Sequence, residues 1–586
     1  MNNSSTVIGN LSGGALTITN GGLVTDMFGV LGSAAGVTGT AIVDGAGSSW
    51  TSSSDLLIGS SGTGVLTLSN GGKASAGALT LAHQASSIGT LNIGGAAGGP
   101  AAAAGIVNAP LIQFGAGIGT VNFNHTETAY DFASVFAGSG TINQLAGNTN
   151  ITGTSGTFFG ATNVHGGRLA VNGSLVGSIV TVSGGVLGGT GTVGGIVANA
   201  GGTVGPGNSI GTLNVNGDVT FAPGSTYQVE VAGTSQSDLI AVTGTATLGG
   251  AVKVVKPSGG YALNSHYTIL TAAGGITGIF DDASAASGPL PFLLFDLSSD
   301  PNNIYLDVSR SAATFASVGV TRNQKAAGAG TESLGNGIVD AIVQLNTASA
   351  LDAFDALSGE IHASASGRLM EDDRFVREAA LDRLRDAERG KQGDTGLWMR
   401  GFGSWGTFDG DGNAAAFDRD IGGFVVGADN EFSTDVTIGL LGGYSRSTFQ
   451  LGDSRHSSGS SDNYQLGLYG GTQWGNFAFR AGTAYTWHEL ETSRSVDFDG
   501  FSDRLEADYS AQTAQAFGEF AYRIETGDTP AGALAFEPFA NLAYVNLATD
   551  GFDESGGAAA LTGRDDDSGV TFTTLGVRAS TQVSGG

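Results

Sequence analysis

Apolar and polar residues alternate in short runs through the first 250 residues of the chain. Residues 16–19 read Leu-Thr-Ile-Thr, residues 66–69 read Leu-Thr-Leu-Ser, and residues 91–93 read Leu-Asn-Ile. An alternation with a period of two predicts strands that bury one face. The runs end in Asn-Gly or Asp-Gly steps, such as residues 70–71 and 44–45, which suit turns with positive φ. We therefore expect short strands separated by tight turns.

The alternating runs recur at a fixed spacing. Residues 7–22 and 57–72 carry the same pattern at an offset of 50, and half-period copies follow at residues 40–45 and 89–95. Fixed spacing in this range indicates a solenoid, and a unit of about 25 residues fits one coil. We predict an all-β, right-handed parallel β-helix with apolar residues stacked inside and Thr, Ser and Asn outside. The apolar residues that we align between coils, 24 to 26 residues apart, are Leu16, Ile42, Leu66 and Leu91.

The pattern changes twice in the second half of the chain. Between residues 310 and 391 glycine becomes rare, and apolar residues recur every three or four positions, which predicts helix. From residue 396 the alternation returns in segments long enough for the roughly 9–11 residues that cross a bilayer as a strand. The predicted helical face consists of Leu369, Phe375, Val376, Ala379, Ala380, Arg383 and Leu384. About eight strands are predicted, starting near Leu397, Gly422, Thr437, Asn463, Phe477, Thr513, Phe536 and Val570.

These later strands have two unlike faces. Phe477, Phe479 and Ala481 are predicted to face lipid, and Arg480 and Gly482 to face inward. A soluble β-sandwich is the alternative, but it explains neither the preceding helix nor the inward charges. Other predicted outward residues are Leu575, Val577, Ala579, Phe520, Tyr522 and Ile524, opposite Thr574, Gly576, Arg578, Glu519 and Arg523. Glycines predicted to line the inside are Gly427, Gly439, Gly443, Gly467 and Gly482, and the predicted aromatic girdle contains Trp398, Trp405, Trp474 and Trp487.

Charge narrows the range of functions. The net charge is −28, and the only cationic residues from Met1 to Pro301 are Lys73, Arg168, Lys253 and Lys256. Such a surface gains little from phosphate contacts, so nucleic-acid binding is not expected. The chain has no cysteine, its first residues lack the features of a signal peptide, and it has no run of about 18 apolar residues. We therefore expect any membrane insertion to use a β-barrel.

Short motifs suggest chemistry, but their contexts argue against it. Residues 207–211 fit G-x-S-x-G and residues 189–194 fit G-x-G-x-x-G, yet neither opens a helix as those sites require. Gly452-Asp453-Ser454-Arg455 falls in a predicted barrel loop. We therefore predict no catalytic, cofactor-binding or metal-binding residues, and no enzyme activity. The seven histidines, none at metal-ligand spacing, are His83, His125, His165, His266, His362, His456 and His488.

Several stretches match a known pattern. Residues 189–217 and 225–270 resemble the closing repeat and junction of surface-exported passengers, and residues 355–364 and 373–377 resemble the linker that follows them. Residues 396–401, Gly-Leu-Trp-Met-Arg-Gly, resemble the opening of the matching barrel. The chain is thus similar to the autotransporter (type V secretion) family. The resemblance implies a passenger, a helix that enters the barrel lumen, and a twelve-strand barrel ending on an aromatic residue.

This resemblance sets our expectations for organisation and function. Because the sequence ends at residues 583–586 after about eight strands, we expect a fragment truncated at the C-terminus. No Asn-Asn pair precedes the barrel, which argues against one known route of self-cleavage. The predicted parts are a β-helix passenger (1–220), a junction that assists folding (221–310), a helical linker (311–393) and a partial barrel translocator (394–586).

We expect the chain to export its own passenger to the cell surface, with an adhesin-like role, while the barrel stays in the outer membrane. The expected partners are outer-membrane lipid, the barrel-assembly machinery, and ligands on host or neighbouring cells. No cofactor is expected. Two alternatives stay open: a displayed enzyme whose catalytic part is missing from this chain, and a soluble repeat protein of structural function.

Overall fold

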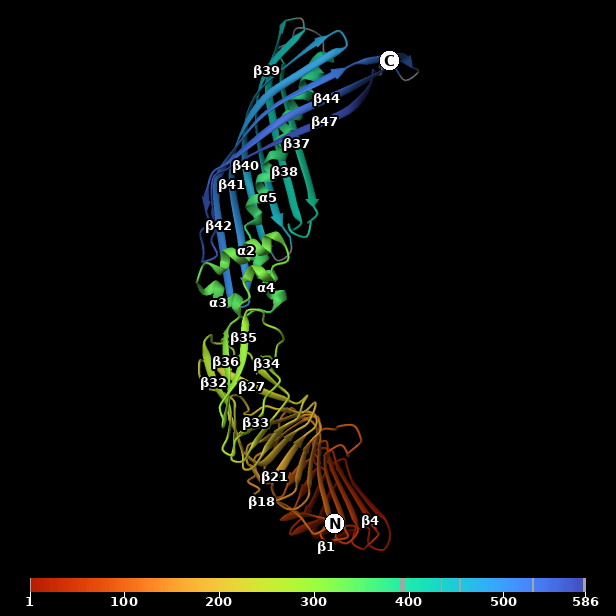
Figure 1. Ribbon diagram of the computed structural model, residues 1–586. Coiled ribbons are helices and arrows are strands. Elements are labelled where there is room, and N and C mark those ends of the chain that lie inside the picture. The colour runs from red at the N-terminus through yellow and green to blue at the C-terminus, as the bar shows by residue number, and fades with distance from the viewer. Residues whose placement is uncertain (1, 390–395, 434, 453–454, 530–531, 583–586) are drawn as a thin grey trace. The chain divides into compact units, whose positions relative to one another are not determined.

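The computed structural model describes residues 2–389, 396–433, 435–452, 455–529 and 532–582. The chain forms two compact units, Met1–Ser311 and Ala312–Gly586, which are described separately (Figure 1). Among the described residues, the regular elements of the first unit are all strands, and those of the second are six helices and a set of long strands. The short repeated strands, the helices and the long strands therefore follow one another in the fold in the order that the sequence predicted.

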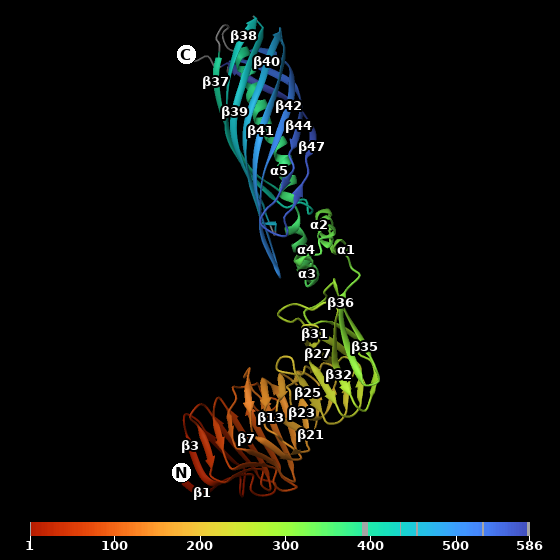
Figure 2. The ribbon, with the colours of Figure 1, turned by 90° about the vertical axis from the view of Figure 1, so that its left-hand side faces the viewer.

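The first unit is a parallel β-helix whose coils stack strand upon strand, as Figure 2 shows at its N-terminal end. The first sheet contains β1 (Asn2–Ile8), β3 (Leu23–Leu31), β5 (Ser49–Ser52), β6 (Asp55–Ile58), β8 (Lys73–Ser75), β9 (Ala78–Leu81), β11 (Ile106–Asn108), β12 (Leu111–Phe114), β15 (Val135–Gly138) and β18 (Thr157–Phe158). The second sheet begins with β2 (Gly14–Ile18), β4 (Thr38–Asp44), β7 (Thr63–Ser69), β10 (Ile88–Gly94), β13 (Ile118–Asn124), β16 (Thr141–Ala146), β19 (Ala161–Val164), β21 (Ser174–Val182) and β23 (Thr192–Ala198). It continues with β25 (Thr212–Val215), β26 (Val219–Phe221), β29 (Leu239–Val242), β30 (Ala246–Leu248), β32 (Ser265–Ala272), β33 (Ile276–Gly278), β35 (Leu293–Ser299) and β36 (Asn303–Arg310). The third sheet contains β14 (Tyr130–Phe132), β17 (Asn148–Ile151), β20 (Arg168–Val171), β22 (Val186–Gly188), β24 (Thr203–Val204), β27 (Thr226–Ala232), β28 (Gln236–Ser237), β31 (Ala251–Val255) and β34 (Asp282–Ala285).

The register between coils corrects one predicted alignment. Leu66 pairs with Leu91 on one side and with Ala41 on the other, so the repeat here is 25 residues. Ile42 instead pairs with Thr67, and its side chain is 43% exposed. Its neighbours Ala41 and Val43 are buried. A shift of one residue reverses the face of a strand, so the prediction of Ile42 as a core residue is wrong.

Glycines mark where successive coils approach one another closely. Gly39, Gly64 and Gly89 lie directly opposite each other in the second sheet. A Cβ on Gly39 would lie 2.1 Å from the carbonyl oxygen of Ile8, and one on Gly64 would lie 2.1 Å from the backbone nitrogen of Gly59. No side chain fits at that distance, which explains why glycine recurs with the period of the coil.

Apolar side chains stack along the axis of the solenoid. The rings of Phe114, Phe136 and Phe158 form one cluster in which every pair is in contact, with centroids 5.4 to 6.2 Å apart. A ladder of amides, whose members Asn92 and Asn122 are buried, links four coils: Asn122 donates to Asn92, Asn143 to Asn122, and Asn163 to Asn143, at 2.9 to 3.0 Å. The parallel order ends at β36, which pairs antiparallel with both β32 and β35.

The second unit begins with six helices and continues as a curved antiparallel sheet. The helices are α1 (Phe315–Val318), α2 (Arg322–Glu332), α3 (Gly337–Val343), α4 (Thr347–Leu357), α5 (Glu360–Asp372) and α6 (Arg374–Arg389). The strands are β37 (Gly396–Phe408), β38 (Phe417–Ser433), β39 (Val436–Leu451), β40 (Ser457–Trp474), β41 (Phe477–Phe498), β42 (Phe501–Tyr522), β43 (Ile524–Thr529), β44 (Gly532–Thr549) and β47 (Asp566–Gln582), with a small pair β45 (Phe552–Asp553) and β46 (Thr562–Gly563). β37 and β47 lie at the two ends of the series of long strands, each of which pairs with the next.

The eight long strands confirm the number and order read from the alternation. Thr513 and Asn463, taken as strand starts, instead lie inside β42 and β40, because these strands are longer than a bilayer requires. The helix predicted before the sheet is two helices, since α5 ends at Asp372 and α6 begins at Arg374. Helices α1 to α4 form a separate group at one end of the sheet (Figure 1).

Candidate functional site

Helices α5 and α6 lie inside the curve of the sheet in both views (Figures 1 and 2). The predicted helical face is buried there: Val376, Ala380 and Leu384 are at most 1% exposed. Phe375 stacks on Phe402 of β37, with ring centroids 4.9 Å apart. The strand residues that form this contact are Val425, Leu441, Tyr469, Ala484, Phe517 and Ala543. The lumen of the sheet is therefore filled by a helix of this same chain.

A buried arginine ties α6 to three strands. Arg480 of β41 is 1% exposed and contacts Glu388 of α6 at 2.5 Å, Glu519 at 2.6 Å and Glu537 at 3.0 Å. Arg578 of β47 approaches Glu519 at 2.6 Å and Glu537 at 3.1 Å. Each carboxylate thus has a cationic partner, as burial of charge requires.

A second group fixes α6 one turn earlier. Arg383 makes two hydrogen bonds of 2.7 Å to the carboxylate of Asp429, which also accepts one of 2.8 Å from the Tyr469 hydroxyl. The indole of Trp398 donates to Tyr469 at 2.6 Å. Trp398 therefore points into the lumen, and its assignment to the aromatic girdle is wrong. The reason is its position opposite Gly427, where a Cβ would lie 2.5 Å from the indole ring.

The junction of α5 and α6 carries a third group. Asp372 pairs with Arg419 of β38 and accepts a hydrogen bond of 3.2 Å from Ser447. Asp373 accepts one of 2.8 Å from Thr486. All of these residues face the lumen, so polar contacts follow the helix along most of its length.

Helices α1 to α4 cover the end of the sheet at which the loops are long. Arg455 lies 3.0 Å from Asp355 and 2.7 Å from Glu360, at the end of α4 and the start of α5. Arg494 of β41 donates to the carbonyl of Ala356 at 3.1 Å and pairs with Glu554 at 2.5 Å. We call α1 to α4 the helical cap. The periodicity of residues 310–391 predicted helix in this region but not its position over one end of the sheet.

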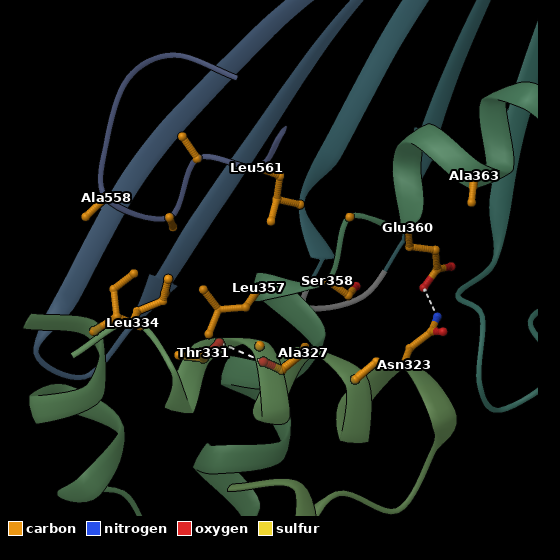
Figure 3. Close-up of a pocket in the computed structure, with 16 residues that line it drawn as sticks. Asn323, Ala327, Thr331, Leu334, Leu357, Ser358, Glu360, Ala363, Ala558 and Leu561 are labelled. Atoms are coloured by element: carbon orange, nitrogen blue, oxygen red, sulfur yellow. Dashed lines mark hydrogen bonds between the residues drawn. The ribbon is translucent and has the colours of Figure 1, made fainter. Parts of the chain in front are cut away.

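A cavity of about 530 Å³ lies between the cap, the start of α5 and the loop that precedes β46. Figure 3 shows Leu334 and Leu357 on one wall and Leu561 on another, with Glu360 and Asn323 joined by a hydrogen bond at one side. Small residues form much of its lining, and they are Ala326, Ala327, Gly330, Ala363, Ala558, Ala559 and Ala560. The polar side chains that line the cavity already form hydrogen bonds within the protein. The lining therefore does not indicate a particular class of ligand.

The two faces of the strands agree with the prediction. Phe477 and Phe479 are 44% and 41% exposed on the outside, while Arg480 and Glu519 are buried in the lumen. Leu575 and Val577 point outward at 75% and 65% exposure. Thr574, predicted inside, is exposed. The predicted glycines Gly427, Gly439, Gly443, Gly467 and Gly482 all lie on the inner face, at positions where a Cβ would crowd neighbouring side chains.

The short motifs lie where the sequence placed them. Residues 207–211 form a connection between β24 and β25, and residues 189–194 lead into β23, so neither match precedes a helix. Asp453 and Ser454 lie outside the described residues. In the part of the chain that the structure describes, no three His, Cys, Asp or Glu side chains form a group able to hold a metal ion. The described helices include none that is both long enough and apolar enough to span a bilayer.

One surface cluster in the first unit contains the residue types of a hydrolase. The imidazole Nδ1 of His266 lies 2.6 Å from Asp307, and the ring stacks on Tyr305 with centroids 4.7 Å apart. The Ser298 hydroxyl donates to Asp307, at 3.3 Å. A catalytic triad needs the serine on the imidazole, not on the carboxylate. In this cluster the serine contacts the carboxylate instead, so the three residues do not form a catalytic triad.

A small polar pocket of about 190 Å³ also lies in the first unit. Arg168 donates to the carbonyl of Gly207 at 2.6 Å, and Asp238 accepts hydrogen bonds from the backbone of Gly211 and Glu230 at 2.9 and 2.8 Å. Burial raises the pKa of Asp238 to about 7, although these two backbone donors act in the opposite direction. Nothing in the sequence pattern singled out Asp238, because its burial depends on the packing of neighbouring coils.

Comparison with known proteins gives a family match for the C-terminal part of the chain and relatives that extend over more of it. The model of a family described as the autotransporter beta-domain matches residues 397–586. Two extracellular serine proteases of Serratia marcescens are 34% and 32% identical over 504 and 505 residues, which is 76% of this chain and 46% and 47% of theirs. The chain thus spans about half the length of these relatives. The adhesin BmaC autotransporter of Brucella suis is 37% identical over 100 residues, 16% of this chain and 3% of its own.

Among solved structures, the translocator domain of the autotransporter NalP from Neisseria meningitidis is similar, at 20% identity and a TM-score of 0.31. The similarity covers 38% of this chain and 73% of that one. The prediction that the chain has no enzyme activity is contradicted by the first two relatives, which are named as extracellular serine proteases. It relied on the absence of a recognisable motif, and that is weak evidence against activity.

Proposed function

The chain belongs to the autotransporter family, and we propose that its second unit exports its first unit through the bacterial outer membrane. The family places the barrel in that membrane and the passenger at the cell surface. One observation carries the proposal: α5 and α6, which follow the passenger in the chain, run through the lumen of the sheet. A helix in this position is what remains in the lumen when the preceding chain has passed through.

The lengths of the loops indicate which end of the sheet faces the outside of the cell. At one end of the sheet two connections are tight, since β38 ends at Ser433 and β39 begins at Val436, and β40 ends at Trp474 and β41 begins at Phe477; the third contains the short strand β43. At the other end β41 and β42 are joined by residues 499–500, but the remaining connections include the longer segments 409–416 and 550–565. Outer-membrane barrels have short periplasmic turns and longer extracellular loops. The helical cap packs at the long-loop end, so the passenger leaves the sheet on the extracellular side.

Folding of the passenger supplies the drive in this proposal. Each new coil buries apolar side chains against the previous one, as Leu66 does against Leu91. A solenoid grows by contacts between neighbouring coils, so folding can start at one end and proceed without a nucleotide. Outer-membrane lipid and the barrel-assembly machinery are the partners that this route requires.

For the passenger itself we favour a role in extracellular proteolysis over an adhesin-like role. The serine-protease relatives match over 504 and 505 residues, whereas the adhesin matches over 100. A fluorophosphonate probe applied to cells that display the chain should label it if it carries an active serine. Absence of labelling together with binding of cells to a host-cell layer would instead favour the adhesin.

Export itself is tested by labelling from outside. The chain has no cysteine, so Thr19→Cys, at an exposed position, gives a single reactive site in the passenger. With a periplasmic export signal ahead of Met1, a membrane-impermeant maleimide should label intact cells that express the full chain. Deletion of residues 396–582 should abolish labelling, and surface labelling that survives the deletion would contradict the proposal. Leu68→Cys, a fully buried position, is the matched control that should not react.

A further inference from the structure

The outer face of the second unit changes chemistry partway along its longest strands. On β41 the alternate outward residues are first apolar or aromatic, apart from Thr483, and then polar or acidic. In order from the short-turn end they are Phe477, Phe479, Ala481, Thr483, Tyr485, Trp487, Glu489, Glu491, Ser493, Ser495 and Asp497. On β42, from the same end, they are Tyr522, Phe520, Gly518, Ala516, Ala514, Gln512, Ser510, Asp508, Glu506, Arg504 and Ser502. Both strands thus change from apolar to polar in their middle.

The change follows rows that cross the sheet. Phe424, Tyr444, Tyr464 and Trp487 lie directly opposite one another on β38 to β41. The next outward row, two residues further along each strand, contains Gly422, Arg446, Asp462 and Glu489. A row of four aromatic side chains therefore borders a row whose three side chains, on β39 to β41, are all charged.

The hydroxyl group of Tyr444 in the aromatic row points toward the polar row. Tyr444 donates to Asp462 at 2.6 Å, and Asp462 is paired with Arg446 at 2.7 Å. The ring of Tyr444 packs against that of Tyr464, with centroids 5.5 Å apart. Tyrosine and tryptophan take this orientation at a boundary between hydrocarbon and water, where the ring is apolar and one end forms hydrogen bonds.

The length of the apolar part matches a bilayer. Phe477 and Trp487 are ten residues apart on β41. At about 3.4 Å per residue and a strand tilt near 40°, this separation spans about 26 Å, which is close to the 25 Å apolar band of outer-membrane barrels. The remainder of β41, from Trp487 to Phe498, is about as long again.

The second half of these strands has the polarity of a water-soluble wall. None of the large apolar side chains exposed on the described residues falls between residues 488 and 519. On the inside of this part, Leu490, Ala507 and Tyr509 pack with Ile361 and Leu369 of α5. Apart from Arg494, which is paired with Glu554, this inner face is mainly apolar, and the outer face is polar and charged. A sheet surrounded by water, not lipid, has this distribution.

We propose that the outer-membrane boundary crosses β38 to β41 at the row Phe424, Tyr444, Tyr464 and Trp487, and that the distal half of the sheet stands in the hydrated layer outside the membrane. The inference rests on the proposed function, because it places the second unit in that membrane. The lipid partner covers the outward residues from Phe477 to Trp487 and stops there. The cap and the distal half of the lumen therefore lie beyond the bilayer.

Single-cysteine variants test this placement in the full chain, which has no cysteine of its own. Ala516→Cys and Ser510→Cys are a matched pair, both exposed on the outer face of β42 and six residues apart. Ala481→Cys and Ser493→Cys form the equivalent pair on β41. Each variant carries an environment-sensitive fluorophore and is reconstituted in vesicles of phosphatidylethanolamine and phosphatidylglycerol.

The fluorophore at residues 481 and 516 should show blue-shifted emission and be quenched by spin-labelled lipid, whereas at residues 493 and 510 it should be quenched by aqueous iodide. Lipid quenching at residues 493 and 510 would overturn the placement while leaving the barrel in the membrane. Iodide quenching at all four positions would instead contradict membrane insertion, and with it the proposed function.

Discussion

The two units use the same alternation of residues with opposite orientation. In β10 of the passenger, Leu91 and Ile93 are fully buried and Thr90 faces outward. In β41 of the barrel, Phe479 is 41% exposed and Arg480 is 1% exposed. A period of two shows that a strand has two unlike faces, but it does not show which face meets the solvent or what the solvent is.

Length and the type of polar residue separate the two cases. The passenger strands have two to nine residues, and their polar residues are mostly neutral, as in the amide ladder through Asn122. The eight long barrel strands have 13 to 22 residues, and their inward polar residues include Arg480, Glu519 and Arg578. In the barrel the inward charges have partners of opposite sign on α6 or on neighbouring strands, as Arg480 has in Glu388 and Glu519.

The largest effect should come from a charge placed on the wrong face of the passenger. Val43→Asp buries an unpaired carboxylate at a fully buried position and should destabilise the passenger by more than about 4 kcal/mol. Ile42→Asp, at the adjacent exposed position, should change stability by less than about 1 kcal/mol. The measurement is the urea concentration at which protease first cuts the passenger of the full chain. Equal effects of the two variants would contradict the observed register.

Removal of a buried charge, in place of its introduction, tests the interior of the barrel. Arg480→Gln leaves Glu388, Glu519 and Glu537 with less cationic compensation, and loss of one partner from a buried ion pair costs about 3–5 kcal/mol. We expect α6 to become open to protease in the detergent-solubilised chain. Arg446→Gln, which breaks an exposed pair with Asp462 on the outer face, is the control and should cost at most about 1 kcal/mol. Continued protection of α6 in Arg480→Gln would show that apolar packing alone holds it.

The pH dependence of the passenger should reflect one buried carboxyl group. The pKa of Asp238 is raised from 3.8 to about 7, so the folded state binds more protons than the unfolded state between these values. The stability of the passenger should therefore fall as the pH rises from about 4 to 7, on the order of 2 kcal/mol once screening in the open pocket is allowed for. Urea unfolding at several pH values measures this slope.

Asp238→Asn should remove that slope. Asp218→Asn is the matched control, because hydrogen bonds from Thr245 lower the pKa of Asp218 and its contribution to the slope has the opposite sign. A slope unchanged by Asp238→Asn would mean that other groups of the passenger cause the pH dependence.

The smallest effect should come from the amide ladder. Asn122→Ala removes the donor to Asn92 and the acceptor of Asn143, and each lost bond costs about 1 kcal/mol. Asn163→Ala removes only the bond to Asn143, so it should cost about half as much. Thermal unfolding of the passenger measures both. Equal costs would mean that the ladder does not act as a chain of separate bonds.

Much of the fold could be predicted because it depends on local periodicity. The eight long strands, the inward Arg480 and the buried face of α6 follow from residue spacing alone. Ile42 was misassigned because repeated apolar residues can be aligned one position away from the true register. Its pairing with Thr67 in the fold shows which register is correct. Trp398 was misassigned because a tryptophan near a strand end suits both a girdle and a lumen.

The lumen contacts could be predicted only in part. Sequence spacing placed Arg480 inside, but its partner Glu388 is 92 residues away in the chain and lies on another element. The position of the helical cap depends on Arg455 and Arg494, whose contacts with α4 span 100 and 138 residues. Pairings of this kind depend on the folded arrangement, and no local pattern encodes them.

Protease treatment of intact cells that express the full chain tests the central claim most directly. The account predicts that residues 1–311 are degraded from outside, while a fragment that contains α5, α6 and the barrel strands stays in the outer membrane, as mass spectrometry of the recovered peptides would show. A passenger that resists protease on intact cells and is digested only after the outer membrane is opened would contradict export.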